Sequence, residues 1–206
     1  RFETHQLTMV EMVRYDVESG TSVVLDESGT AWPVAACRGP VAAGDASGRD
    51  ALSPLRSADG LFWESDLREV TPGSSFQDRL ECTFVGPDLT GDVSLVVRAI
   101  NTTLSGTMTE FLDRLLGESW LAFVQAIEYD SEMIEIMRRW TADASLEVAV
   151  WDGRSWQAMG RVFPEANVVP FTRLVRCRVP AGVGDTLRVR LSSLTGAWKL
   201  DSVALD

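Results

Sequence analysis

The sequence is poor in histidine and cysteine. Its single histidine, His5, lies near the first residue, where chains tend to fray, and no Gly-x-Ser-x-Gly motif is present. A Ser-His-Asp or Cys-His device is therefore not expected. One histidine and the separated Cys37, Cys82 and Cys177 do not have the spacing of a zinc site. The lone Gly-x-Gly of residues 182–184 lacks the rest of a dinucleotide motif. We predict no catalytic residues, no metal and no cofactor.

The sequence also lacks an excess of positive charge and a long apolar run. Nineteen basic residues stand against 30 acidic ones, and the net charge of -11 would repel a phosphate backbone. A nucleic-acid partner is not expected. No run of about 18 apolar residues appears, so no membrane-spanning segment is expected. Lysine occurs once, as Lys199, and this preference for arginine indicates a GC-rich, bacterial coding sequence.

The first residue is Arg1 rather than methionine, so we expect the sequence to be part of a longer protein. Residues 1–36 contain strand-like runs, with turn residues at 26–29, and predict an N-terminal β-meander. Residues 37–60 are rich in Gly, Ala, Ser and Pro and predict a loop or linker. Residues 61–206 are assigned to one domain, in which the strand-like runs 79–85 and 92–100 are expected to pair as antiparallel neighbours.

The periodicity of the middle of the chain is helical. Residues 107–116 place apolar side chains at i, i+3, i+4, i+7 and i+8, with Thr107 and Glu110 spaced as a capping box and Gly117 at the end. The next segment, SWLAFVQAIEY, is apolar on nearly all sides and is predicted to be buried. A third segment, SEMIEIMRRW, begins with acids and ends with arginines, which suits a helix dipole. We predict a helical insertion at 107–140.

Five strand-like runs follow residue 144, and their close spacing favours an antiparallel β-sandwich. The predicted fold class is mainly β, a jelly-roll-like antiparallel sandwich with an inserted helical subdomain. VWDGRSWQAMGRV, LRVRL and AWKLDSVAL resemble the last strands of galactose-binding-like jelly rolls, which include carbohydrate-binding modules and discoidin-type domains. The resemblance covers under a third of the chain, and the helical insertion departs from that family. It implies a sandwich fold and ligand binding.

The run LEVAVWDGRSWQAMGRV is typical of a β-hairpin that carries two tryptophans. A loop of two or four residues places Trp151 and Trp156 on one face, a four-residue loop sets them opposite each other, and a three-residue loop separates them. Leu146, Val148 and Val150 form the core row on the other face. We expect the helical insertion to cover the tryptophans, with a carbohydrate platform and a protein interface as the alternatives.

Arginines alternate with apolar residues in the runs RCR and RVR. If these strands pair, Arg176, Arg178, Arg188 and Arg190 share one sheet face. Such a patch suits an anionic sugar or lipid head group, because guanidinium groups bind carboxylate and phosphate well. The alternative, which we favour, is pairing with some of the 30 acidic residues.

The acidic stretch DGLFWESDLRE places Trp63 and Asp66 among several carboxylates. One interpretation is a ligand or calcium site, and the carboxylates could also serve a glycosidase, which needs two of them. The interpretation that we favour is a solvated edge anchored to the core by Phe62 and Trp63.

Together these patterns predict a non-catalytic binding or interaction module for a carbohydrate or protein partner, in a secreted or cell-envelope bacterial protein. The alternatives are a carboxylate-based glycan hydrolase and a structural accessory domain.

Overall fold

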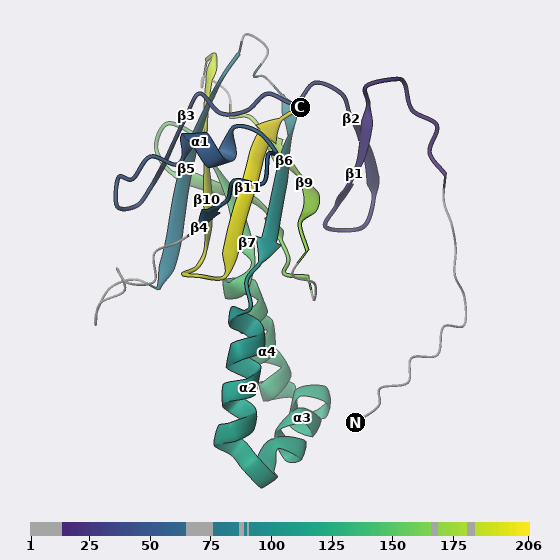
Figure 1. The fold of residues 1–206 in the computed structure, drawn as a ribbon, viewed down its shortest axis with the longest axis vertical. Helices are drawn as coiled ribbons and strands as arrows, with labels where there is room; N and C mark the ends of the chain where they lie inside the picture. The colour runs from purple at the N-terminus through teal and green to yellow at the C-terminus, as the bar shows by residue number, and fades with distance from the viewer. Residues whose placement is uncertain (1–13, 65–75, 87–88, 90, 166–168, 181–183) are drawn as a thin grey trace.

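The computed structural model describes residues 14–64, 76–86, 89, 91–165, 169–180 and 184–206. Two β-sheets face each other across one core, and three helices project from one end (Figure 1). Sheet A has the order β2-β1-β9-β6-β11-β4 and sheet B the order β3-β5-β10-β7-β8. Among the described strand pairs, neighbours run antiparallel except β1 and β9, which pair in parallel over two residues. The predicted mainly β sandwich with a helical insertion is confirmed at this level.

Strands that follow one another along the chain often lie in different sheets. Those of sheet A are β1 (Ser22–Asp26), β2 (Ala31–Val34), β4 (Trp63–Glu64), β6 (Asp92–Asn101), β9 (Phe171–Arg178) and β11 (Trp198–Leu205). Those of sheet B are β3 (Ala42–Asp45), β5 (Gln77–Val85), β7 (Leu146–Trp151), β8 (Trp156–Val162) and β10 (Thr186–Leu194). All five strands expected after residue 144 are present.

The core lies between the sheets and follows the period-two pattern of the strands. In β10, for example, Leu187, Val189 and Leu191 point inward and are buried. Cys82 and Cys177 are buried free thiols in the same core, as their strand positions predict. Burial raises the pKa of each of these two thiols to about 12, so both are unreactive at neutral pH.

The prediction that residues 79–85 and 92–100 pair with each other is wrong. Strand β5 lies in sheet B between β3 and β10, whereas β6 lies in sheet A between β9 and β11. The connection therefore crosses from one sheet to the other. Turn residues mark where a strand ends, but they do not fix which sheet the next strand joins.

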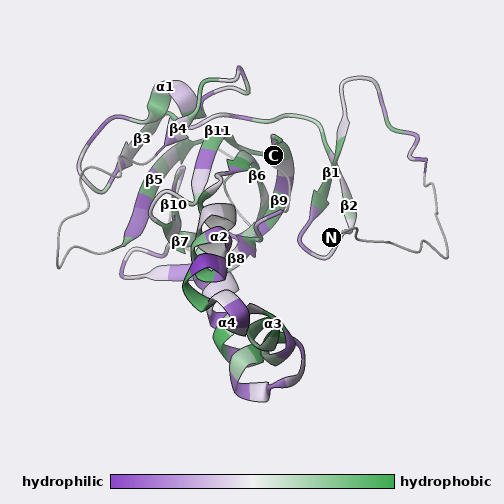
Figure 2. Ribbon diagram, turned by 60° about the horizontal axis from the view of Figure 1, so that its bottom comes forward, coloured by the Kyte–Doolittle hydropathy of each residue, from purple (hydrophilic) through white to green (hydrophobic). Residues whose placement is uncertain are grey.

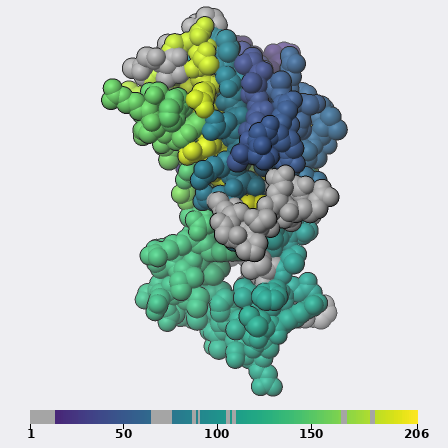
Figure 3. Space-filling model, turned by 90° about the vertical axis from the view of Figure 1, so that its left-hand side faces the viewer, coloured from purple at the N-terminus to yellow at the C-terminus, as the bar shows by residue number. Residues whose placement is uncertain are grey.

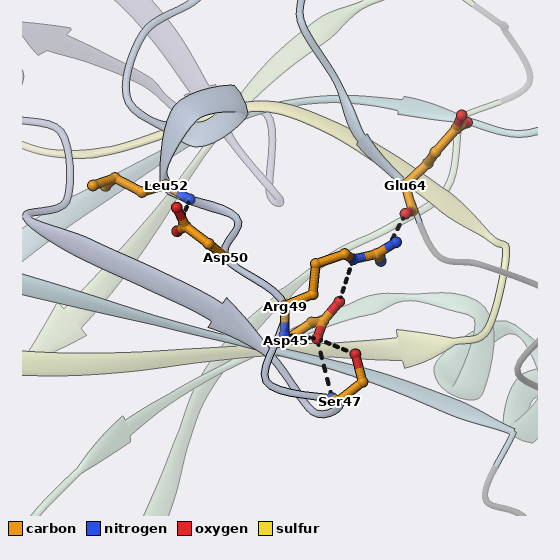
Figure 4. A network of polar contacts seen from close by, with 6 residues as sticks. All are labelled: Asp45, Ser47, Arg49, Asp50, Leu52 and Glu64. Carbon is orange, nitrogen blue, oxygen red and sulfur yellow. Dashed lines mark hydrogen bonds and ion pairs between the residues drawn. The ribbon is translucent and has the colours of Figure 1, made fainter.

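Residues 37–60, predicted as a loop or linker, contribute β3 and a short helix, α1 (Leu52–Leu55), between stretches without regular structure. Leu55 is fully buried. Asp45 accepts hydrogen bonds from Ser47 and Arg49, and Arg49 reaches the backbone oxygen of Glu64 in β4 at 3.2 Å (Figure 4). Pairing with β5 outweighs the weak strand propensity of a segment rich in Gly, Ala and Ser.

Of the expected N-terminal β-meander, the described residues show one hairpin, formed by β1 and β2. Its turn uses Asp26 and Gly29, as predicted, and the Gly29 N–H donates to the Asp26 carbonyl at 3.1 Å. Residues 14–21 form no strand, and residues 1–13 lie outside the described residues. The hairpin joins sheet A through β9, so β1 and β2 do not form a separate sheet.

The predicted helical insertion is confirmed, with wider bounds. It consists of α2 (Leu104–Leu116), a 3-10 turn at Gly117–Ser119, α3 (Trp120–Tyr129) and α4 (Ser131–Ala144). The capping-box prediction is wrong, because α2 starts after Thr103 and Thr107 lies inside the helix. Gly117 does end the helix, with a positive φ of 51°.

The prediction that the middle helix is buried is wrong. Nothing in α3 or α4 is classed as buried in the described structure, and Leu121 and Tyr129 are exposed. The helices form a lobe that projects from the sandwich (Figure 3) and contains many hydrophobic residues (Figure 2). Several of these residues, such as Phe111, Leu115 and Ile136, are exposed. We call residues 104–144 the helical arm. The all-round apolar pattern of residues 119–129 predicts a helix correctly but does not specify what that helix packs against.

Both ends of the helical arm are held at the turn before β11. The Thr102 N–H donates to the Ala197 carbonyl at 3.0 Å, just before α2. At the other end, the indole N–H of the buried Trp198 donates to the Ala144 carbonyl at 2.8 Å. This fixed base places the last turn of α4 beside the outer face of sheet B.

Candidate functional site

The β7–β8 hairpin brings the two tryptophans together. The register pairs Trp151 with Trp156 across a four-residue loop, as one of the predicted loop lengths requires. Their ring centroids are 5.3 Å apart with the planes tilted by 57°. The carboxylate of Asp152 holds the loop by accepting from the backbone N–H groups of Ser155 and Arg154, each at 2.7 Å. These hydrogen bonds lower the pKa of Asp152 to about 2.

Arginines, rather than the helical arm, lie over the two rings. The guanidinium carbon of Arg190 is 4.7 Å from the Trp156 ring centroid, and that of Arg188 is within 5.5 Å of both rings. Strand β7 leads away from α4, so that Trp151 stands at the end of the strand remote from the arm. Both tryptophans are partly exposed. The expectation that helices cover them is therefore not met.

The outer face of sheet B, which we call the sheet B face, combines these rings with charged groups. Its outward-pointing residues are Arg79, Glu81 and Thr83 of β5, Arg188, Arg190 and Ser192 of β10, Glu147, Ala149 and Trp151 of β7, and Trp156, Ala158 and Arg161 of β8. Two ion pairs cross between strands, Arg188 with Glu81 at 2.7 Å and Arg161 with Glu147 at 3.1 Å. The favoured pairing of arginines with acids thus holds for Arg188.

Arg190 differs from these paired arginines. Among the described residues, its Nε atom is buried and has no hydrogen-bond partner, and no carboxylate lies within ion-pair distance of the side chain. Burial lowers its pKa, and the positive charge of Arg79 lowers it further, against the opposing effect of Glu81 and Glu147. Arg190 also lines a cavity of about 110 Å³ beside the base of the arm.

The predicted clustering of four arginines is wrong. Strand β9 lies in sheet A and β10 in sheet B, so Arg176 and Arg178 are on the opposite side of the sandwich from Arg188 and Arg190. Arg176 stacks on Trp32 at 4.7 Å and contacts Asp92 at 3.3 Å. The alternation within each strand was interpreted correctly, but the strands are not neighbours.

The acidic stretch near residue 63 does not form an open platform in the part of the chain that the structure describes. Trp63 is buried in the core, as its anchoring role requires, and has no open ring face. Glu64 forms an ion pair with Lys199 at 2.5 Å. Asp66 lies outside the described residues.

Sequence reasoning missed Arg79, Arg161 and Ser192 as members of the sheet B face. Alternation does place each of them on the solvent side of its strand. Their proximity to Arg190 depends on the pairing of β10 with β5 and β7, to which no local motif points.

The described residues contain no cluster of His, Cys, Asp or Glu side chains suited to a metal ion. None of their helices has both the length and the apolar character needed to cross a membrane.

A second cavity, of about 490 Å³, lies beside the β1–β2 hairpin. One of its walls is the segment 15–18, which belongs to no helix or strand, and its charged lining residues Asp16, Glu18 and Asp206 are all acidic. It offers no rigid aromatic surface and no cation, so the sheet B face is the stronger candidate.

No protein-family model and no curated protein matches the chain.

Proposed function

We propose that the chain is a non-catalytic binding module that holds a carbohydrate against the sheet B face, as a jelly-roll module of a secreted or cell-envelope bacterial protein. The observation that carries the proposal is the pair formed by Trp151 and Trp156, with Arg188 and Arg190 over the rings. Aromatic rings offer a flat apolar surface to the C–H groups of a sugar, and guanidinium groups donate hydrogen bonds to its hydroxyls.

The position of the pair on paired strands supports this proposal. Both rings stand on β-strands that are fixed by the pairing of β7 with β8 and by the Asp152 loop, so little conformational entropy is lost on binding. Of the two small residues between the rings and the arm, Ala158 is exposed, whereas Ala149, which pairs with it, is buried beneath its neighbours. Rigid aromatic anchors of this kind contribute much of the binding energy in known interfaces.

The described carboxylates of β5 and β7 on this face support binding rather than hydrolysis. A glycosidase needs one carboxyl group that gives its proton to the leaving group and a second one opposite it. Glu81 and Glu147 each accept a hydrogen bond from an arginine, which suits a structural role.

The test is to replace Trp151 and Trp156 singly with alanine and to measure binding on a panel of oligosaccharides. Each substitution is expected to weaken binding at least about tenfold, because a stacking surface is lost. Since the rings are only partly buried, each change should lower the free energy of unfolding by about 1–3 kcal/mol, less than the cost for a fully buried aromatic.

Trp120→Ala is the matched control, because Trp120 stacks on Phe123 in the helical arm, outside the sheet B face. It should leave glycan binding unchanged. Equal binding by the wild type and both hairpin variants, or no binding of any glycan by the folded protein, would refute the proposal.

A further inference from the structure

The cavity beside Arg190 lies where the sheet B face meets the helical arm. Its lining includes Arg79 of β5, Arg190 and Ser192 of β10, and Arg161 of β8. Asp143 of α4 and Glu147 of β7 line it as well. Glu147 is already paired with Arg161. Among the described residues, no carboxylate forms an ion pair with the other two arginines of the cavity, Arg79 and Arg190.

Arg190 connects this cavity to the tryptophan pair. One side of its guanidinium group stacks on Trp156, and the side chain also lines the cavity. The register puts Arg188 level with Trp151 and Ser192 level with Glu147. The distance along β10 between residues 188 and 192 is about 13 Å at 3.3 Å per residue, so a single ligand of two or more sugar units can reach both regions.

The charges in the cavity favour an anion. The positive charge of Arg79 is close enough to Arg190 to lower the pKa of Arg190. The buried Nε of Arg190 also lacks a hydrogen-bond acceptor among the described residues. A buried donor without an acceptor costs free energy, which a bound oxyanion would recover. Ser192 also lines the cavity, and its hydroxyl is a further donor.

We propose that the ligand is an acidic sugar, whose carboxylate binds Arg79 and Arg190 in this cavity while a neighbouring ring stacks on Trp151 and Trp156. This inference rests on the proposed function, since it names the class of carbohydrate. A carboxylate matches the planar guanidinium fork. A densely sulfated chain fits less well, because the net charge of -11 and the two acids in the cavity repel a polyanion.

The test compares galacturonic acid oligosaccharides with the same oligosaccharides after reduction of their carboxylates to primary alcohols. Binding is measured by titration calorimetry at two salt concentrations. The acidic form should bind about 10- to 100-fold more tightly, as charged hydrogen bonds imply, and its affinity should fall with added salt. The reduced form should bind weakly and without dependence on salt.

Arg79→Gln should remove most of the preference for the acidic form but leave binding of the reduced form unchanged. Arg190→Gln should remove the preference as well and also weaken binding of the reduced form, because Arg190 lies over the Trp156 ring. Arg178→Gln is the matched control, because Arg178 lies on the opposite sheet. The preference of Arg178→Gln for the acidic form over the reduced form should equal that of the wild type. Thermal denaturation of each variant confirms that it is folded.

Three outcomes overturn the inference. Equal affinity for both forms, with the tryptophan substitutions still weakening binding, refutes the acidic ligand but keeps the proposed function. Tighter binding of sulfated than of carboxylated oligosaccharides refutes the proposal that the anionic group of the ligand is a carboxylate. Binding of neither form, together with no binding of any other glycan, refutes both proposals.

Discussion

At the scale of single residues, the clearest feature is the use of aspartates to hold turns. Asp26 and Asp152 each accept hydrogen bonds from N–H groups of the loop that follows, and the pKa of each is lowered to about 2. In both cases the side chain supplies acceptors that the tight backbone cannot supply itself. These carboxylates therefore favour the folded state only while they are ionised.

The first prediction follows from the sign of these shifts. Because the pKa of Asp152 is lower in the folded than in the unfolded chain, its contribution is complete above about pH 4 and disappears as the pH falls towards 2. Asp152→Asn should therefore lower the melting temperature at pH 7, and the difference from the wild type should shrink towards pH 2. Melting curves recorded by circular dichroism from pH 2 to 7 measure this.

Asp113→Asn is the control, since Asp113 is an exposed residue on α2 rather than part of a turn. It should leave the pH profile of the wild type unchanged. A gap between wild type and Asp152→Asn that stays constant over the whole pH range would contradict the assigned role of the carboxylate.

At the scale of elements, strand partners decide what each segment becomes. The β7–β8 hairpin is local and could be inferred from its turn residues, including which face carries the tryptophans. By contrast, β3 is a strand because it pairs with β5, about 40 residues further along the chain. Its own residues, Ala42–Asp45, have little intrinsic preference for a strand.

The second prediction tests the packing of the segment 37–60. A Cβ atom added at Gly39 would lie 2.5 Å from the backbone oxygen of Arg56, so the backbone would have to move. Gly39→Ala should cost about 1–3 kcal/mol, as overpacking does. At Gly44 the nearest atom would be 3.6 Å away, so Gly44→Ala should cost much less. Urea denaturation of both variants gives the comparison, and equal stability would mean that the segment is not packed as described.

At the scale of the whole molecule, stability is unevenly distributed. The sandwich contains the main core, whereas no side chain of the described helices α3 and α4 is fully buried. Helices of 10 to 14 residues are marginal in water without tertiary packing. The helical arm is thus held mainly at its base, through Thr102 and Trp198.

The third prediction concerns the difference in stability between the sandwich and the helical arm. Amide hydrogens of α3 and α4 should exchange with solvent at least about 100-fold faster than those of β5 and β10, because the helices can open without disrupting the core. Hydrogen exchange followed by mass spectrometry of the native protein would show it. Protection of the helices equal to that of the central strands would contradict the picture of an arm held at its base.

The sequence by itself determined what depends on near neighbours along the chain. The period of apolar residues predicts the helical arm and the strands, turn residues predict the Trp151–Trp156 hairpin, and inward strand positions predict the buried Cys82 and Cys177.

Only the tertiary structure decided what depends on pairing between distant segments. It placed β5 and β6 in different sheets, put Arg176 and Arg190 on opposite faces, and brought Arg79 beside Arg190. The physical reason is that alternation specifies which side of a strand is apolar, whereas the choice of neighbour depends on the packing of both sheets around one shared core.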